Sequence, residues 1–233
     1  MFLLTPLLRA FFKWFYQRGA WSYDLIAAVV SLGRWQTWVR SILPRVHGRY
    51  VLEVGYGPGH LLAALQTPGR LVVGLDASPQ MAHLAGRRLH RHAGHRGENR
   101  QHGEAPPDNT PTTPGILIGY TQHSPFPAGA FDQVIATFPT EHIFTLEALR
   151  ELYRILRPGG ELLLLPMAWI TARSPWARAA AALFRITGQS APGNTNWQAL
   201  FAPRFAAAGF ALQCEMLTLP GSSLLVLSAR KES

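Results

Sequence analysis

The stretch that decides the fold is VLEVGYGPGHL, residues Val51–Leu61. An apolar run containing Glu53 is followed by three glycines in five residues, Gly55, Gly57 and Gly59. A buried strand followed by a glycine-rich turn and a helix brings the backbone close to a ligand at the helix N-terminus. The stretch therefore predicts a strand–turn–helix unit whose turn approaches a bound molecule.

The spacing of the glycines argues against a dinucleotide. Dinucleotide sites use G-x-G-x-x-G, whereas here the third glycine comes one residue early and His60 follows it. Glu53, two residues before the first glycine, would repel a pyrophosphate and suits a ligand that carries an ammonium group. Asp76 ends the next strand, where a carboxylate can accept both ribose hydroxyls. The two acids together indicate S-adenosylmethionine, which has an amino-acid end and a ribose.

Apolar segments alternate with helical patterns over most of the chain. We expect strands at 49–57, 70–78, 115–120, 131–138 and 159–167, helices at 59–67, 78–92 and 146–156, and a final hairpin over 210–231. This alternation is typical of doubly wound α/β proteins. We therefore predict a Rossmann-like, seven-stranded, mostly parallel sheet with an antiparallel final hairpin.

The chain divides into N-terminal helices over 1–45 and an α/β domain over 46–233. The segment 86–115 is rich in His, Arg, Gly and Pro and poor in apolar residues, so it predicts a mobile insertion. Its histidines (His90, His92, His95 and His102) have irregular spacings, and we predict no metal site there. A helical insertion is expected at 170–208, after the fifth strand, where loops commonly carry substrate contacts.

The formal charge of +9 comes almost entirely from arginine, because Lys13 and Lys231 are the only lysines. We interpret this charge as composition bias and expect no nucleic-acid partner, since no strand interleaves aromatic and basic residues. The single cysteine, Cys214, excludes a disulfide framework and favours a reducing, cytoplasmic setting.

Two interpretations of the N-terminus stay open. Arg9, Lys13 and Arg18 interrupt its apolar residues, so no uncharged run reaches the roughly 18 residues of a membrane span, and no signal-peptide cleavage site follows. The aromatic residues of this segment can form a lid over a substrate pocket. Alternatively, residues 1–40 can lie as an amphipathic segment at a membrane surface, which would make the protein peripheral there.

Four stretches in order resemble the successive motifs of class I S-adenosylmethionine-dependent methyltransferases. They are VLEVGYGPGHL, VVGLDASPQM, PFPAGAFDQVIATF and LRELYRILRPGGELLLL, and together they cover roughly residues 50–165. The resemblance implies that Glu53 orients the methionine amino end, that Asp76 binds the ribose, and that Ala77 and Met81 flank the adenine. The full set of implied cofactor residues is Glu53, Gly55, Tyr56, Gly57, Gly59, Asp76, Ala77, Met81, Thr121, Gln122 and Thr137.

The sequence departs from the family pattern after the third strand. Relatives have GDAExLPF, whose acid meets the adenine amino group, whereas this chain has GYTQHSPF with Tyr120 in place of the acid. The backbone of Thr121 or the side chain of Gln122 is expected to take over that contact. Phe138 and Pro139, after the fourth strand, are expected to border the methyl-transfer site.

A narrower resemblance lies upstream, where SYDLIAAVVSLGRWQTWVR is similar to the N-terminal signature of quinone-ring C-methyltransferases. The matching residues are Tyr23, Asp24, Ser31, Gly33, Trp38 and Arg40, whereas Ala27 stands where asparagine is usual. The fourth strand is followed by TFPTEHI and not by the usual FGLRN. The resemblance therefore implies common ancestry and leaves the substrate open.

These patterns predict methyl transfer to a small, lipophilic or aromatic acceptor, quinone- or lipid-like. His142, with Glu141 beside it, is the first candidate for a general base; His123, His60 and Tyr56 are others. The alternative is a non-catalytic protein that binds S-adenosylmethionine or associates with a membrane. A nicotinamide oxidoreductase is disfavoured by the glycine spacing, and a nucleic-acid methyltransferase by the absence of an NPPY-type motif.

Overall fold

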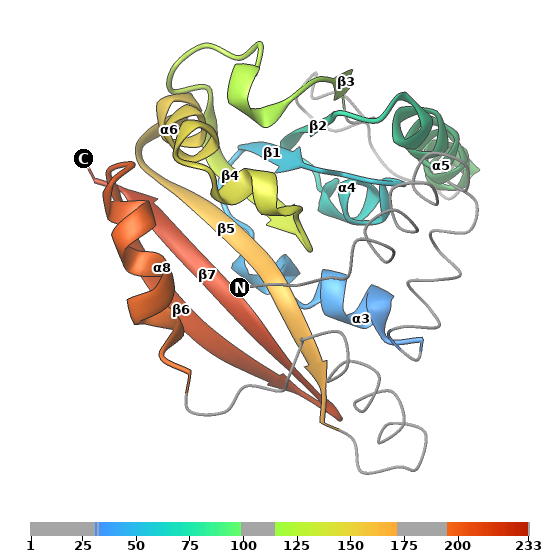
Figure 1. Cartoon of the computed structure of the whole chain (residues 1–233). Coiled ribbons are helices and arrows are strands. Elements are labelled where there is room, and N and C mark those ends of the chain that lie inside the picture. Colours follow the sequence, from blue (N-terminus) through green and yellow to red (C-terminus); the bar gives the residue numbers. More distant parts are fainter. Residues whose placement is uncertain (1–30, 32, 99–114, 172–194, 233) are drawn as a thin grey trace, which may run out of the picture.

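A computed structural model describes residues 31, 33–98, 115–171 and 195–232 of the chain, with the backbone alone for 93–98. Within these residues seven strands form one sheet in the order β3-β2-β1-β4-β5-β7-β6 (Figure 1). The strands are β1 Tyr50–Val54, β2 Leu71–Asp76, β3 Gly115–Ile118, β4 Phe131–Thr137, β5 Leu156–Ile170, β6 Phe210–Leu219 and β7 Ser222–Lys231.

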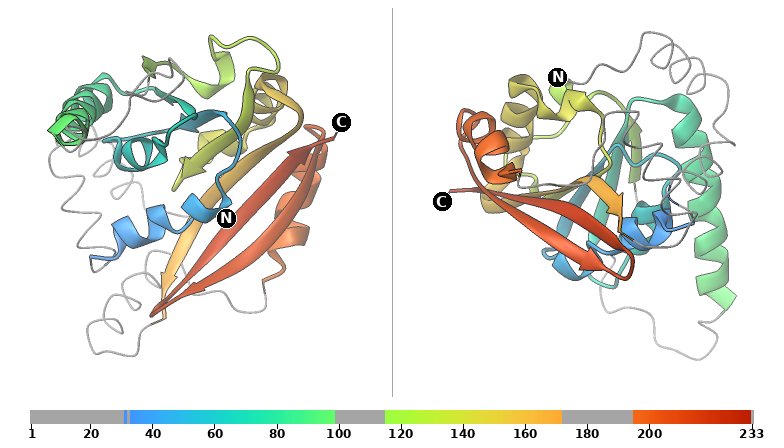
Figure 2. Two further views of the ribbon diagram at one scale, coloured as in Figure 1. Left: turned by 180° about the vertical axis from the view of Figure 1, so that it is seen from behind. Right: turned by 60° about the horizontal axis from the view of Figure 1, so that its bottom comes forward.

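The first five strands are parallel, and β7 runs antiparallel to both β5 and β6. This confirms the predicted mostly parallel sheet with a reversed final hairpin. The hairpin turns at Pro220–Gly221, where Gly221 has a positive φ of 69°. In Figure 2 the long strands β5, β6 and β7 project beyond the shorter parallel strands.

Helices cover both faces of the sheet (Figures 1 and 2). They are α3 Trp35–Arg40, α4 His60–Leu65, α5 Pro79–Glu98, α6 Leu146–Ile155 and α8 Trp197–Ala206, with one-turn helices η1 Leu43–Arg45, η2 Thr121–His123 and η3 Glu141–Phe144. Successive residues of a strand point to opposite faces. Val51 thus packs with α3, α4 and α5, and Leu52 packs with α6 and α8.

The helix after β2 is longer than predicted. We expected a mobile insertion from residue 86, yet α5 continues to Glu98. Met81, Ala85 and Leu89 lie four residues apart, and all three are buried in the core, so one apolar stripe packs the first part of this helix against the sheet. The remaining part of that predicted insertion lies outside the described residues.

Two further expectations fall mainly outside the described residues. Of the N-terminal helices predicted over 1–45, the structure describes α3 and η1; most of the segment expected to form the lid (1–45) or the membrane contact (1–40) lies outside the described residues. Of the insertion at 170–208, α8 is described and 172–194 are not. Among the described residues, no helix is long and apolar enough to cross a membrane.

A buried polar network ties the chain before β1 to the amino ends of β4 and β5. The amide nitrogen of Gln133, a residue with no exposed surface, donates to Glu161 Oε2 at 2.9 Å and to the Arg45 carbonyl at 3.1 Å. Its amide oxygen accepts from the His47 N–H at 3.0 Å. Buried polar groups are tolerated when they are hydrogen-bonded, so this network fixes the start of β1 against the sheet.

Candidate active site

The predicted site residues meet where neighbouring parallel strands end. Glu53 of β1 pairs in register with Gly74 of β2 and with Ile135 of β4. Asp76 ends β2, and Thr137, half-buried, ends β4. Ligands of open α/β sheets bind at this edge, outside the carboxyl ends of the strands.

The three glycines of the loop have two different duties. All have positive φ, 68° at Gly55, 51° at Gly57 and 79° at Gly59. Residues that carry a side chain rarely adopt this backbone conformation. A Cβ added at Gly55 or Gly57 would meet no atom of the described residues within 4 Å, whereas one at Gly59 would lie 2.9 Å from the Ala85 Cβ. The first two glycines therefore border open space, and the third allows α5 to pack closely.

Asp76 is held by the backbone of the glycine loop and of the turn before α5. Its Oδ2 accepts from the Gly57 N–H at 2.9 Å, and its Oδ1 accepts from the Ser78 N–H at 2.9 Å. Burial raises the pKa of Asp76, and these two backbone hydrogen bonds oppose the rise. Each carboxylate oxygen keeps a further lone pair, so the group can still accept hydroxyl donors from a ribose.

Glu53 is the most unusual group of the site. It is only 2% exposed, and its Oε2 has no hydrogen-bond partner among the described residues. Burial, and secondarily the negative charge of Asp76, raise its pKa well above the usual value. A buried polar atom without a partner is costly, and a cation placed beside it would relieve that cost. The site therefore fits a ligand with an ammonium group next to a ribose.

Two of the predicted cofactor residues have side chains in the core. Tyr56 is 3% exposed, and a Cβ at Gly74 would come within 2.6 Å of its ring. Burial and then Asp76 raise its pKa to about 12, so the phenol is protonated at neutral pH. Met81 is 6% exposed inside the α3–α5 core, whereas Ala77 is exposed beside Asp76.

The segment that departs from the family pattern lies next to β2. The Gly119 N–H donates to the Asp76 carbonyl at 3.0 Å. This hydrogen bond brings residues 120–122 toward the end of the site where we expect the adenine of the cofactor. Thr121 and Gln122 are half-buried on η2, and the Tyr120 side chain just before them is 68% exposed. Ala77 and these residues are therefore the accessible groups on this side of the site.

The two candidate catalytic residues lie beyond the end of β4. Glu141 and His142 are exposed residues of η3. The Thr145 hydroxyl donates to the His142 carbonyl at 2.9 Å, and this hydroxyl also accepts the Ala148 N–H that begins α6. Of the other base candidates, His123 is exposed and lies 3.9 Å from Glu147. The structure thus brings the cofactor residues together and places the proposed base on a separate surface turn.

An aromatic contact at the end of β4 was not predicted from the sequence. The rings of Trp35 on α3 and Phe138 lie 4.3 Å apart, and Trp38 lies 6.1 Å from Phe138. Both tryptophans are visible in the stretch GRWQTWVR. No local sequence pattern, however, indicates that they contact the residue after the fourth strand.

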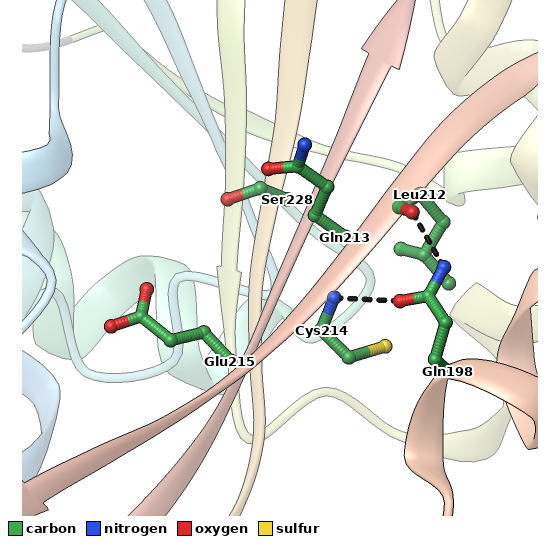
Figure 3. A pocket seen from close by; sticks show the side chains of 6 residues that line it. All are labelled: Gln198, Leu212, Gln213, Cys214, Glu215 and Ser228. Carbon is green, nitrogen blue, oxygen red and sulfur yellow. Dashed lines mark hydrogen bonds between the residues drawn. The ribbon is translucent and has the colours of Figure 1, made fainter.

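A pocket of about 380 Å³ lies elsewhere, at the β6 edge of the sheet (Figure 3). Gln198 of α8 reaches across this pocket, donating to the Leu212 carbonyl at 2.7 Å and accepting from the Cys214 N–H at 2.9 Å. The side-chain amide of Gln198 thereby makes the two hydrogen bonds to β6 that the backbone of an additional strand would make. This covers part of an otherwise open edge, so we interpret the contact as structural.

Comparison with known proteins gives consistent results. Residues 52–164 match the family described as "Methyltransferase domain". The chain is 29% identical over 157 residues to demethylmenaquinone methyltransferase of Symbiobacterium thermophilum, which covers 64% of this chain and 56% of that protein. It is 31% identical over 153 residues to demethylmenaquinone methyltransferase of Thermus thermophilus, covering 61% and 60%. The match thus spans less than two thirds of these relatives.

Solved structures share the fold. A methyltransferase of Thermotoga maritima superposes with a TM-score of 0.56 at 17% identity, covering 93% of this chain and 98% of that one. Phosphoethanolamine N-methyltransferase 2 of Haemonchus contortus, solved with S-adenosyl-L-methionine, superposes with a TM-score of 0.55 at 17% identity, covering 86% and 53%. Because the domain match, the curated relatives and the fold agree with the geometry of the loop, the chain carries a methyltransferase domain over residues 52–164 that is similar to those of class I S-adenosylmethionine-dependent methyltransferases.

Proposed function

We propose that this protein transfers a methyl group from S-adenosylmethionine to a small, lipophilic or aromatic acceptor of the quinone or lipid type. The observation that supports S-adenosylmethionine as the methyl donor is the buried Oε2 of Glu53, which has no hydrogen-bond partner among the described residues and lies near the glycine loop and Asp76. The acceptor class is supported by the names of the curated relatives and by the aromatic rings that lie at the end of β4.

The chain's own residues would hold and orient the donor. The carboxylate of Glu53 binds the ammonium group, Asp76 accepts the ribose hydroxyls, and the open sides of Gly55 and Gly57 admit the cofactor to the backbone. The cofactor supplies a methyl on a sulfonium, which is already a good leaving group, so the protein mainly aligns the reactants and excludes water. Ala77, Thr121 and Gln122 border the adenine, and Thr137 borders the transferred methyl.

His142 is the proposed general base, with Glu141 beside it. Its role would be to accept the proton that a carbon or oxygen nucleophile loses on methylation. Because the side chains of Glu141 and His142 are exposed, a bound acceptor would have to cover these two residues before proton transfer. His142→Gln should therefore lower kcat and leave the affinity for S-adenosylhomocysteine unchanged.

The test uses the full chain with S-adenosylmethionine labelled on its methyl group. Demethylated naphthoquinols, phospholipids and fatty acids are offered separately, and label in the organic extract is measured. We expect label in one acceptor class, with Asp76→Ala, which removes the proposed ribose contact, as the inactive control. Binding of S-adenosylhomocysteine without label in any acceptor would instead support the non-catalytic binding protein, and binding of NAD alone would refute the assignment of the site.

A further inference from the structure

The backbone at Phe138 turns a side chain to the unexpected face of the sheet. Along β4, Ile135 packs with α3, α4 and α5, whereas Val134 and Ala136 pack with α6 and α8. By this alternation residue 138 would face α6 and α8. Phe138 has φ +47° and packs against the α3–α5 core instead. The left-handed conformation therefore directs the ring to the face on which Val51 and, two residues on, Glu53 lie.

This conformation is unfavourable for the residue that adopts it. A bulky side chain rarely has positive φ, and the following Pro139 further restricts the backbone of the residue before it. The Phe138 N–H donates to the Leu165 carbonyl at 2.7 Å, so pairing with β5 continues through the turn. Strained residues of this kind persist where the surroundings hold them and gather at ligand sites.

Trp35, whose ring packs against Phe138, is positioned by the start of α3. Trp35 begins α3, and its N–H donates to the Ser31 hydroxyl at 2.9 Å. One turn later the Trp38 indole N–H donates to the hydroxyl of Ser222 in the final hairpin at 2.9 Å. The tilt between the Trp35 and Phe138 rings is 30° at 4.3 Å. Both rings are half-buried, so each keeps some surface open to a ligand.

We propose that Phe138 and Trp35 form the wall of the acceptor site and stack against a flat ring of the acceptor. Phe138 directly follows β4, the strand that pairs with β1 and Glu53, so the wall lies at the edge where the donor binds. Aromatic rings favour offset stacking with other flat rings, and a preformed pair needs no ordering when the ligand arrives. The proposal rests on the proposed function and narrows its acceptor from lipids in general to ring compounds.

The test measures ligand binding and turnover separately. The probe is a dimethylnaphthoquinone with both quinone ring positions methylated, so it can neither accept a methyl nor add the thiol of Cys214. Its affinity is measured by quenching of tryptophan fluorescence in wild type, Phe138→Leu, Phe138→Tyr and Phe144→Leu. Phe144 is a matched control, since it is a half-buried phenylalanine that packs on Phe201 at 5.5 Å with the opposite core.

We expect Phe138→Leu to weaken probe binding about fivefold, and Phe138→Tyr and Phe144→Leu to change it by less than about twofold. Calorimetry with S-adenosylhomocysteine should give unchanged affinity in all variants, which shows that they are folded. Equal losses in Phe138→Leu and Phe144→Leu, an unchanged affinity in Phe138→Leu, or no probe binding by wild type would each overturn the proposal.

Turnover separates this proposal from the proposed function. If the probe binds as expected but no acceptor is methylated, the aromatic wall stands and the methyl-transfer proposal fails. If wild type methylates an acceptor and Phe138→Leu leaves its KM unchanged, the wall fails and the proposed function stands.

Discussion

Replacing Gly57 or Gly59 with alanine should separate the two roles of the glycine loop, which are access for the cofactor at Gly57 and close packing against α5 at Gly59. Both residues have positive φ, so an alanine costs about 1–2 kcal/mol of unfolding free energy at either position. At Gly59 the new methyl also lies 2.9 Å from the Cβ and 3.1 Å from the Cα of Ala85, and such overpacking typically adds about 1–3 kcal/mol. We therefore expect a loss of about 1–2 kcal/mol for Gly57→Ala and about 2–5 kcal/mol for Gly59→Ala.

Cofactor affinity should show the reverse order. The alanine at position 57 keeps the N–H that binds Asp76, but its methyl enters the open space that we propose for the cofactor. We expect the dissociation constant of S-adenosylhomocysteine to rise at least tenfold, which is about 1.4 kcal/mol. Gly59→Ala, measured where it is folded, should bind within about threefold of wild type because its methyl faces α5.

Urea unfolding gives the stability differences, and calorimetric titration with S-adenosylhomocysteine gives the affinities. The reasoning would be refuted by wild-type affinity in Gly57→Ala, or by a Gly59→Ala protein that is no less stable than Gly57→Ala. Either result would mean that the open and the packed sides of the loop had been assigned to the wrong glycines.

Three further predictions concern the site carboxylates, the Gln133 network and the start of α6. The pKa values of Glu53 and Asp76 are raised in the folded protein. Without cofactor, the folded protein therefore keeps protons that the unfolded chain has already lost. The free energy of unfolding should accordingly fall as the pH rises from about 4.5 through the raised pKa of Glu53. Glu53→Gln should reduce this slope in urea titrations across pH and weaken S-adenosylhomocysteine binding; an unchanged slope would contradict the assignment. Gln133→Leu, which leaves Glu161 and two backbone groups without the partners described, should cost about 2–3 kcal/mol in urea unfolding. Thr145→Ala, which removes the cap of α6, should cost about 1 kcal/mol in the same assay.

The grouping of Glu53, the glycine loop and Asp76 at one edge of the sheet could be predicted because its signals are local. Glu53, the glycine spacing and Asp76 each lie within a few residues of a strand end, and parallel strands bring their carboxyl ends to one edge. The exposure of His142 depends on how the turn after β4 packs, so no sequence pattern could report it. The continuation of α5 to Glu98 was missed because residues 90–98 are polar or small and carry no apolar periodicity that would indicate a helix.

The same contrast holds for single side chains. Tyr56 and Met81 occupy motif positions that predict contact with the cofactor, and the structure places both side chains in the core. Their direction depends on Gly74 and on the neighbouring helices, which are distant in sequence or set by packing.

The sequence by itself determined the strand–turn–helix unit, the acids at its two strand ends and the donor they indicate, because these depend on residue type and short-range spacing. Only the tertiary structure decided that Gly57 borders open space while Gly59 meets Ala85, and that Phe138 turns its ring toward Trp35. Those outcomes arise from contacts between segments that the chain brings together only on folding. Packing at such contacts decides which face a side chain occupies.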